Sequence, residues 1–255
     1  MKNELSIPIA AYSLHKDSWL AAIFGRPVWR VDAANTGDGL IALESAAAVF
    51  AYAKCEVSRV SEVSALSDIG FRVVDTALTF EGVVSTGSTS RCVSVGQVVR
   101  FATQDDRDTV CDIASRAFRF SRFHLDPQVP AGVADRIKAS WARNYFSGKR
   151  GDGMVVAESN GQVVGFLQLL WGQEDTLIID LIGVAPENQG RGMARAMIRY
   201  AAMNGTGDHR RPARILVGTQ AANTPSMRLY ESLGLRMHSA QYVLHYHGKS
   251  PGGTG

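Results

Sequence analysis

The residues with the clearest chemical potential form a glycine-rich run, Gln189–Ala194, which reads Gln-Gly-Arg-Gly-Met-Ala. An apolar stretch, Thr176–Ala185, precedes this run, and it is followed by a helical stripe of Ala194, Met197, Ile198, Ala201 and Ala202. Glycines let the backbone approach a ligand closely, and the first turn of a helix presents unpaired N–H groups at the positive end of the helix dipole. The arrangement predicts a binding site for a phosphate group.

A second polar cluster lies downstream, in the segment Asn223–Gly234. Ser226 and Tyr230 are four residues apart, so a helix would place them on one face. We expect Thr224 to be the N-cap of this helix, with Pro225 at its first position and a glycine stop at Gly234.

The order Gln189-x-x-Gly192-x-Ala194, together with the downstream cluster, resembles the GNAT superfamily of N-acetyltransferases. The last position of the family pattern is alanine here, a variant that leaves the backbone amide free. The resemblance implies an α/β (α+β) GNAT fold with a central mixed, mostly antiparallel sheet flanked by helices. It also implies an enzyme that uses acetyl-CoA as its acyl donor.

The same resemblance implies roles for individual residues. The acyl-CoA pyrophosphate would lie on Gln189, Gly190, Arg191, Gly192, Met193 and Ala194. The main chain of Leu181, Ile182, Gly183 and Val184 would pair with the pantetheine arm and polarise the thioester carbonyl. Asn223 would hold the pantetheine or the departing sulfur, and Tyr230 would be the general acid for the thiolate. A phenol with an ordinary pKa near 10 keeps its proton at neutral pH and is able to donate it.

The general base is less clearly marked. Asp180 lies in an apolar strand on the alternation of Ile182 and Val184, and an acid in such a run requires a partner or a ligand. It is the candidate base for the incoming ammonium group, either directly or through water. A carboxylate that is simply paired with an arginine or a hydroxyl explains the pattern equally well, and the other candidates are Glu158, Glu174 and His124.

For the acceptor, the chain is most similar to the dTDP-fucosamine N-acetyltransferase group. The similarity lies in Ser121–Asp126, Ile179–Val184, Gly218–Asn223, Arg228–Tyr230 and Gly70–Thr76. It implies transfer to the amino group of a dTDP-4-amino-4,6-dideoxyhexose, with Arg122 and His124 in contact with the nucleotide sugar. Two alternatives stay open: another acceptor, such as a protein N-terminus or a small amine, and a non-catalytic acyl-CoA-binding protein.

The elements that must position these residues follow from periodicity. A strand at Val98–Thr103 is expected, then a helix that buries Val110 and Ile113, a proline-containing loop over Ser121–Pro130, and a helix through Trp141. Asn160-Gly161 predicts a hairpin. Further strands are expected at Thr176–Ala185, Arg214–Gln220 and Gln241–His247.

The first ninety or so residues give mixed signals. Strands are expected at Pro27–Val31, Leu40–Leu43 and Phe71–Phe80, and a helix at Ser61–Gly70. A polar linker at 85–90 divides the chain into an α/β domain over 1–90, an acetyltransferase domain over 96–248 and a flexible tail over 249–255. Leu66–Phe80 can be laid over Tyr230–Leu244, so the first domain is a candidate degenerate GNAT half.

Composition narrows the class of protein. The chain has 255 residues, 45% of them hydrophobic, and its net charge of +3 is too small to indicate nucleic-acid binding. Cys55, Cys92 and Cys111 form no paired spacing, and His245 and His247 have no evident third ligand, so no metal site is expected. No signal peptide or membrane span is seen, and a cytoplasmic protein is expected. The residues do not decide the oligomeric state, and a homodimer is one alternative.

Overall fold

The computed structural model describes residues 11–34, 49–84, 96–130, 132–208 and 210–248. The chain divides into two compact units, which are described separately: unit 1 is Met1–Thr76 with Ala240–Gly255, and unit 2 is Ala77–Ser239. The unit boundaries fall inside two strands, β4 (Arg72–Gly82) and β10 (Arg236–His247). None of the helices in the described part of the chain has the length and apolarity needed to cross a bilayer.

Unit 1 is a small sheet with two helices. Its remaining elements are β1 (Ala11–Lys16), α1 (Ser18–Phe24), β2 (Val28–Ala34), β3 (Phe50–Glu56) and α3 (Val60–Asp68). β1 pairs with β2 antiparallel, β2 with β3 parallel, and β3 with β10 antiparallel. Leu66 and Phe71 join residues of the strands in one buried cluster, so the glycine-stopped end of α3 anchors the helix to this sheet.

Unit 2 contains a larger sheet with the strand order β4-β9-β8-β7-β6-β5. Its strands are β5 (Gln97–Phe101), β6 (Gly153–Ser159), β7 (Gln162–Trp171), β8 (Thr176–Val184) and β9 (Arg214–Gln220). The helices are η2 (Gln104–Asp106), α4 (Arg107–Arg116), α5 (Arg122–Leu125), α6 (Val133–Phe146), η3 (Pro186–Asn188), α7 (Met193–Asn204) and α8 (Thr224–Ser232). Among these pairings β8 with β9 is parallel and the others are antiparallel.

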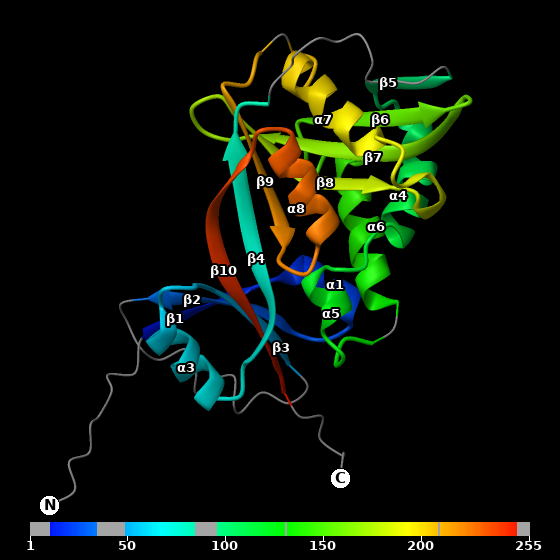
Figure 1. Ribbon diagram of the computed structural model, residues 1–255. Coiled ribbons are helices and arrows are strands. Elements are labelled where there is room, and N and C mark those ends of the chain that lie inside the picture. Colours follow the sequence, from blue (N-terminus) through cyan, green and yellow to red (C-terminus); the bar gives the residue numbers. More distant parts are fainter. Residues whose placement is uncertain (1–10, 35–48, 85–95, 131, 209, 249–255) are drawn as a thin grey trace, which may run out of the picture. The chain divides into compact units, whose positions relative to one another are not determined.

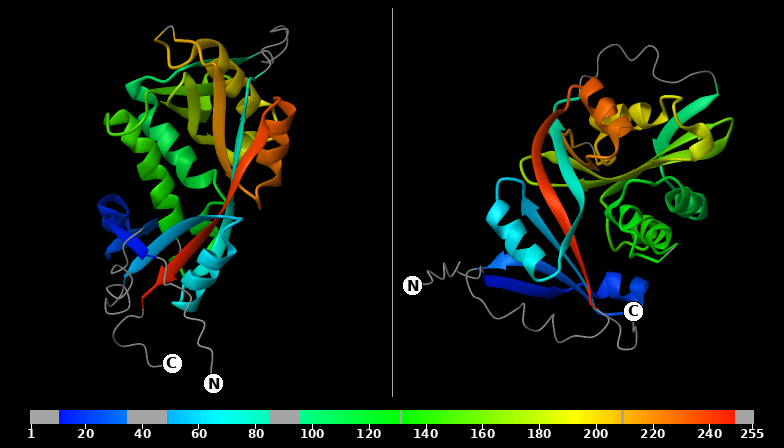
Figure 2. Two further views of the ribbon diagram at one scale, coloured as in Figure 1. Left: turned by 90° about the vertical axis from the view of Figure 1, so that its left-hand side faces the viewer. Right: turned by 60° about the horizontal axis from the view of Figure 1, so that its bottom comes forward.

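Helices cover both faces of the unit 2 sheet (Figure 1, Figure 2). On one face α4 and α6 pack over a cluster that contains Met154, Phe166 and Leu181. On the other face α7 and α8 pack over a larger cluster that contains Leu177, Ile198 and Tyr230. Both sides of the central strands are therefore buried, which explains why β7 and β8 read as continuous apolar runs in the sequence.

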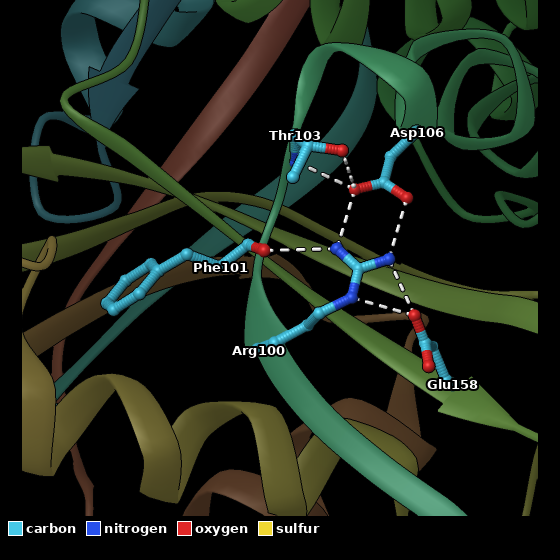
Figure 3. Close-up of polar contacts among 5 residues, drawn as sticks. All are labelled: Arg100, Phe101, Thr103, Asp106 and Glu158. Atoms are coloured by element: carbon cyan, nitrogen blue, oxygen red, sulfur yellow. Dashed lines mark hydrogen bonds and ion pairs between the residues drawn. The ribbon is translucent and has the colours of Figure 1, made fainter. Parts of the chain in front are cut away.

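A hairpin and an ionic network fix the edge of this sheet. Asn160 and Gly161 both have positive φ, 52° and 76°, as the predicted two-residue turn requires. Arg100 of β5 donates to both carboxylate oxygens of Asp106, at 2.8 and 2.9 Å, and to Glu158 of β6 at 2.7 Å (Figure 3). Asp106 also accepts from the Thr103 N–H, and its pKa is lowered mainly by the Arg100 hydrogen bonds. The start of α4 is thus tied to two strands.

The two units share an order of elements. In unit 2, β7 pairs with β8 antiparallel, β8 with β9 parallel, and β9 with β4 antiparallel, which repeats the pattern of β1, β2, β3 and β10 in unit 1. The strand β4 follows α3 but completes unit 2, whereas β10 follows α8 and completes unit 1. This repeated pattern is what a duplication would produce, and the duplication itself stays a prediction.

The helix ends repeat the same correspondence. Phe71 N donates to the Leu66 carbonyl and Leu235 N to the Tyr230 carbonyl, at 3.0 and 3.1 Å. The glycine between donor and acceptor has a φ of +97° at Gly70 and +91° at Gly234. Each helix therefore ends in a left-handed turn that only glycine adopts without strain. Leu66 and Tyr230 accept equivalent bonds at the ends of α3 and α8, and their descent from one duplicated position stays a prediction.

Some expectations need correction or lie outside the described residues. The segment Ser121–Pro130, expected to be a loop, contains the one-turn helix α5, and β1, α1 and β3 were not predicted. The expected strand Leu40–Leu43, the linker at 85–90 and the tail at 249–255 fall outside the described ranges. The two units also differ from the expected domains, because Ala240–Gly255 belongs to unit 1. The domain boundaries stay a prediction.

Candidate active site

The strands β8 and β9 are paired over only part of their length. Their parallel register runs from Thr176–Arg214 to Ile179–Val217 and ends there. Beyond this point Leu181–Val184 continue to pair with β7, and Gly218–Gln220 continue to pair with β4. Figure 1 shows the two strands running in different directions past the last pair. The edge of β8 that faces β9 therefore offers unpaired backbone groups, to which an extended ligand can hydrogen-bond as an added strand would.

The glycine-rich turn lies at the end of this edge. Gly190 and Gly192 have φ values of +76° and +81°, and Gly192 is the N-cap of α7. This cap provides no side-chain acceptor, and the first turn of α7 contains no acidic residue. The N–H groups of the first turn, including those of Met193 and Ala194, are therefore available to an anion.

Neighbouring side chains hold the turn in place. Gln189 Nε2 donates to the Val184 carbonyl at 3.1 Å, which ties the turn to the end of β8. Met193 is 2% exposed and packs in the larger core cluster, so its backbone faces the ligand position while its side chain anchors the helix. Arg191 is exposed beside the turn. The structure thus brings the predicted phosphate-binding residues together next to Leu181–Val184.

A β-bulge lies at Asp180. Gln168 pairs with Leu181 and Leu169 with Ile179, so Asp180 has no partner in β7. The extra residue shifts the alternation of β8: Ile182 and Val184 pack on the α7 side, whereas the Asp180 carboxylate contacts Trp141 of α6. The expectation that Asp180 shares a face with Ile182 and Val184 is wrong, because it assumed an uninterrupted strand.

The Asp180 carboxylate is an acceptor for three side chains. Arg150 donates to it through Nε at 2.7 Å and Nη2 at 2.6 Å, Trp141 Nε1 at 2.9 Å, and Gln168 Nε2 at 3.1 Å. The Asp180 side chain is 6% exposed, and its hydrogen bonds with Arg150 raise the pKa of that guanidinium. This geometry suits a residue that fixes the positions of Trp141 and Arg150. Its role as a general base stays a prediction.

Tyr230 lies on α8, within the larger core cluster. It is 2% exposed, its ring centroid is 5.7 Å from that of Phe80, and Ser226 hydrogen-bonds to it from one turn earlier. Burial raises the pKa of Tyr230 to about 12, and the Ser226 hydrogen bond opposes that rise. The phenol therefore keeps its proton throughout the neutral and mildly alkaline range.

Asn223 is the N-cap of α8. Its Oδ1 accepts from the Ser226 N–H at 3.3 Å, whereas Thr224 is the first helical residue. The expected cap at Thr224 is wrong by one residue, because an asparagine one position earlier makes the capping bond. This bond uses only the oxygen of the Asn223 amide, so the Nδ2 group takes no part in it.

Arg122 and His124 lie on the one-turn helix α5. His124 Nδ1 is 2.6 Å from Ser121 Oγ, and Nε2 is 3.1 Å from Asp135 Oδ1. The Arg122 guanidinium lies 4.4 Å from the Phe123 ring centroid. Both ring nitrogens of His124 are engaged, which fixes the orientation of the imidazole. The predicted contact of Arg122 and His124 with substrate stays a prediction.

Lys138 of α6 is a charged residue that the sequence reasoning missed. It is 9% exposed, and its Nζ lies 4.6 Å from the ring centroid of Phe118 and 4.9 Å from that of Trp141. Burial, together with repulsion from Arg122, lowers the pKa of Lys138 to about 8. The available signal was positional: Lys138 is four residues from both Ala134 and Ala142, on the buried stripe of its helix.

Comparison with known proteins agrees with this geometry. Residues 108–235 match the model of the Acetyltransferase (GNAT) family. The spore coat polysaccharide biosynthesis protein SpsD of Bacillus subtilis is 32% identical over 55% of this chain and 47% of its own length. A mycothiol acetyltransferase of Amycolatopsis mediterranei is 27% identical over 54% of this chain and 45% of its own. The chain spans about half the length of these curated relatives.

Solved structures resemble most of the chain. A tandem GNAT protein from the clavulanic acid biosynthesis pathway aligns with a TM-score of 0.58 at 12% identity, over 88% of this chain and 76% of that one. A GNAT acetyltransferase from Sphaerobacter thermophilus aligns with a TM-score of 0.56 at 17% identity, over 82% of this chain and 64% of that one. The expected GNAT fold class is confirmed.

The substitution Lys138→Met is expected to stabilise the protein at pH 7. The pKa of Lys138 in the folded protein, about 8, lies below its ordinary value of 10.5, so the unfolded chain binds the lysine proton more tightly. The stability of the wild type therefore rises as the pH increases from about 8 to about 10.5. The shift corresponds to roughly 3 kcal/mol as an upper limit, because the aromatic contacts offset part of it. Urea unfolding at pH 7 and pH 9.5 should show an advantage of about 1–3 kcal/mol for the variant at pH 7 that shrinks at pH 9.5.

A variant that is less stable than the wild type at pH 7, with no change in the difference at pH 9.5, would show that the Lys138 ammonium is satisfied where it lies. Lys149→Met is the matched control, because Lys149 follows the same helix but is exposed. It should leave the unfolding free energy nearly unchanged.

Proposed function

The chain belongs to the Acetyltransferase (GNAT) family, and from that premise we propose that it transfers the acetyl group of acetyl-CoA to the amino group of a nucleotide-activated amino sugar. The acceptor is of the dTDP-4-amino-4,6-dideoxyhexose type. The observation that carries the acyl-CoA site is the end of β8–β9 pairing at Ile179–Val217, next to the glycine-rich turn. The unpaired edge of β8 accommodates the extended pantetheine arm, and the glycine-rich turn binds the phosphates at the end of that arm.

The donor is held along this path. The segment Gln189–Ala194 binds the pyrophosphate of acetyl-CoA through the N–H groups from Gly190 onward, because the Gln189 N–H donates to the Pro186 carbonyl. The free edge of Leu181–Val184 pairs with the pantetheine amides. One N–H of the same edge polarises the thioester carbonyl and stabilises the oxyanion that forms on attack. Asn223 uses its Nδ2 group to hold the pantetheine near the sulfur while its oxygen caps α8.

The reaction is direct acyl transfer. The neutral acceptor amine attacks the thioester carbon, the C–N bond forms, and the C–S bond breaks as the tetrahedral intermediate collapses. The amine loses one proton on becoming a neutral nucleophile and another after attack, and the thiolate takes up one. Asp180 is the candidate for the first proton, through a water molecule, because Arg150, Trp141 and Gln168 occupy its carboxylate directly.

Tyr230 assists the departure of the thiolate. Its pKa of about 12 exceeds the ordinary thiol value of about 8.5 by roughly 3–4 units, so complete proton transfer would cost on the order of 5 kcal/mol. Hydrogen-bond donation to the developing negative charge on sulfur has no such cost. The phenol is protonated at every pH used for assay, which makes it a constant donor.

The acceptor assignment is supported by the relative SpsD, whose name connects it with spore coat polysaccharide biosynthesis. Arg122 and His124 on α5 are the residues for contact with the sugar nucleotide. Another small amine is the second candidate acceptor, because mycothiol acetyltransferases are also among the relatives. Unit 1 is in this proposal a degenerate GNAT half, consistent with its repeated strand order.

The acceptor class is tested by a substrate panel. Purified protein is incubated with acetyl-CoA and dTDP-amino sugars, polyamines or peptides, and free thiol release is followed. Turnover is expected with an amino sugar nucleotide and not with the matched sugar that carries a hydroxyl in place of the amine. Clear turnover with peptides or polyamines, and none with any amino sugar nucleotide, would reject the proposed acceptor.

Tyr230→Phe tests the role of the phenol. The ring and its packing on Phe80 are retained, so acetyl-CoA binding should be unchanged while transfer slows by roughly 10²- to 10³-fold, as for loss of one hydrogen-bond donor to the developing charge. Steady-state kinetics and calorimetric binding give the two readouts. Ser226→Ala is the control, because it removes the hydrogen-bond partner of the phenol but keeps the phenol O–H itself. Unchanged turnover in Tyr230→Phe would make Tyr230 a core residue only.

A further inference from the structure

The Lys138 ammonium is a buried charge without an ionic partner. The residue is 9% exposed, and among the described residues none forms a salt bridge or hydrogen bond with its Nζ. The faces of Phe118 and Trp141, 4.6 and 4.9 Å away, offset part of the loss of water. Removing an ammonium group from water without a carboxylate partner is costly, so the position favours any anion that reaches it.

The charges around Lys138 do not neutralise it. Arg122 of α5 is close enough to repel the ammonium, and Asp180 of β8 is the acid whose charge acts on it favourably. The Asp180 carboxylate is already held by Arg150 at 2.6 and 2.7 Å. Asp135, one turn before Lys138 on the same helix, contacts His124. Lys138 therefore has no carboxylate of its own among the described residues, because the acid that acts on it is shared with Arg150.

This positive region is connected to the acyl site. Trp141, which lies against Lys138, donates to Asp180 at the bulge, and Asp180 immediately precedes the free edge Leu181–Val184. An acceptor that reaches the thioester over the α6 face of β8 passes Asp180 and Trp141 and brings its other end toward Lys138. We assign the anion to the acceptor for this reason, and because the phosphates of acetyl-CoA are proposed to lie at the start of α7.

We infer that Lys138, together with Arg122, forms a subsite for an oxyanion of the acceptor, so that the substrate class is an amine that also carries a phosphate or carboxylate group. Assignment of this anion to the acceptor rests on the proposed function, although anion binding itself does not. Phosphate and carboxylate groups share the required chemistry, because both accept charge-assisted hydrogen bonds from an ammonium and a guanidinium. A nucleoside diphosphate is the phosphate source that the proposed acceptor contains.

Calorimetric titration of the full chain tests the subsite directly. The probes are dTDP, inorganic pyrophosphate and glucuronate, each added at pH 7 in the presence of saturating coenzyme A. The coenzyme occupies the glycine-rich turn, so the probes report on a second site. At least one probe should bind the wild type, and Lys138→Met should weaken that binding by about 10- to 100-fold, the usual effect of losing a charged hydrogen bond. Lys149→Met should bind like the wild type.

The pH dependence provides a second readout. Wild-type affinity should fall by roughly tenfold between pH 7 and pH 9.5 as Lys138 loses its proton, and Lys138→Met should show no such fall. The charged groups that act on Lys138 are Arg122 and Asp180, and the nearest charged groups beyond them are Asp135, earlier on α6, and Arg150, which lies over Trp141. Arginine and carboxylate groups ordinarily titrate outside that range, so they do not produce the same change.

Each outcome decides a different point. Binding of dTDP or pyrophosphate assigns a phosphate to the subsite, and binding of glucuronate alone assigns a carboxylate. No binding of any probe to the wild type, or equal binding to Lys138→Met, overturns the inference. Lys138-dependent dTDP binding without acetyl transfer to any amino sugar nucleotide leaves the subsite in place and rejects the proposed function. Acetyl transfer to an amino sugar nucleotide that is equally fast in the wild type and in Lys138→Met leaves the proposed function in place and rejects the subsite.

Discussion

The site depends on one constraint in the sheet of unit 2: β8 and β9 pair only as far as Ile179 and Val217. The bulge at Asp180 begins at the next residue of β8, where the alternation of the strand changes. A bulge increases the local twist of a strand, which directs β8 away from a partner that stays with β4. The backbone N–H and C=O groups of Leu181–Val184 that would otherwise pair with β9 are thereby left for a ligand. They lie directly before the turn that begins α7.

Side chains on the α6 side hold this irregularity. A bulge loses ladder hydrogen bonds, and the Asp180 carboxylate compensates by accepting from Arg150, Trp141 and Gln168. Trp141 in turn forms one wall beside Lys138. The separated strands and the buried cation thus belong to one connected arrangement. A buried, unpaired ammonium lowers stability, and such a cost is common at functional sites, where residues are retained for binding rather than for folding.

Local signals in the sequence predicted much of this structure, and the failures have identifiable causes. The glycine turn, the Asn160-Gly161 hairpin and the Ser226–Tyr230 face depend on backbone preferences that each segment carries by itself. The Asp180 bulge cannot be predicted from such local preferences, because the register shift is set by how β7 and β8 pair and not by the alternation within β8. Lys138 was missed since its burial depends on contacts with Phe118, Trp141 and other segments, although its place on the helical stripe was visible.

Amide hydrogen exchange with and without acetyl-CoA tests the central claim, that the free edge of β8 and the start of α7 form one donor site. On binding, protection should increase together at Leu181–Val184 and at Gln189–Arg195, the two segments that carry unpaired N–H groups. The strand β6, which is paired on both sides, should change little. Saturating acetyl-CoA that protects the turn and leaves Leu181–Val184 unchanged would contradict the account, because the donor arm would then lie somewhere other than between β8 and β9.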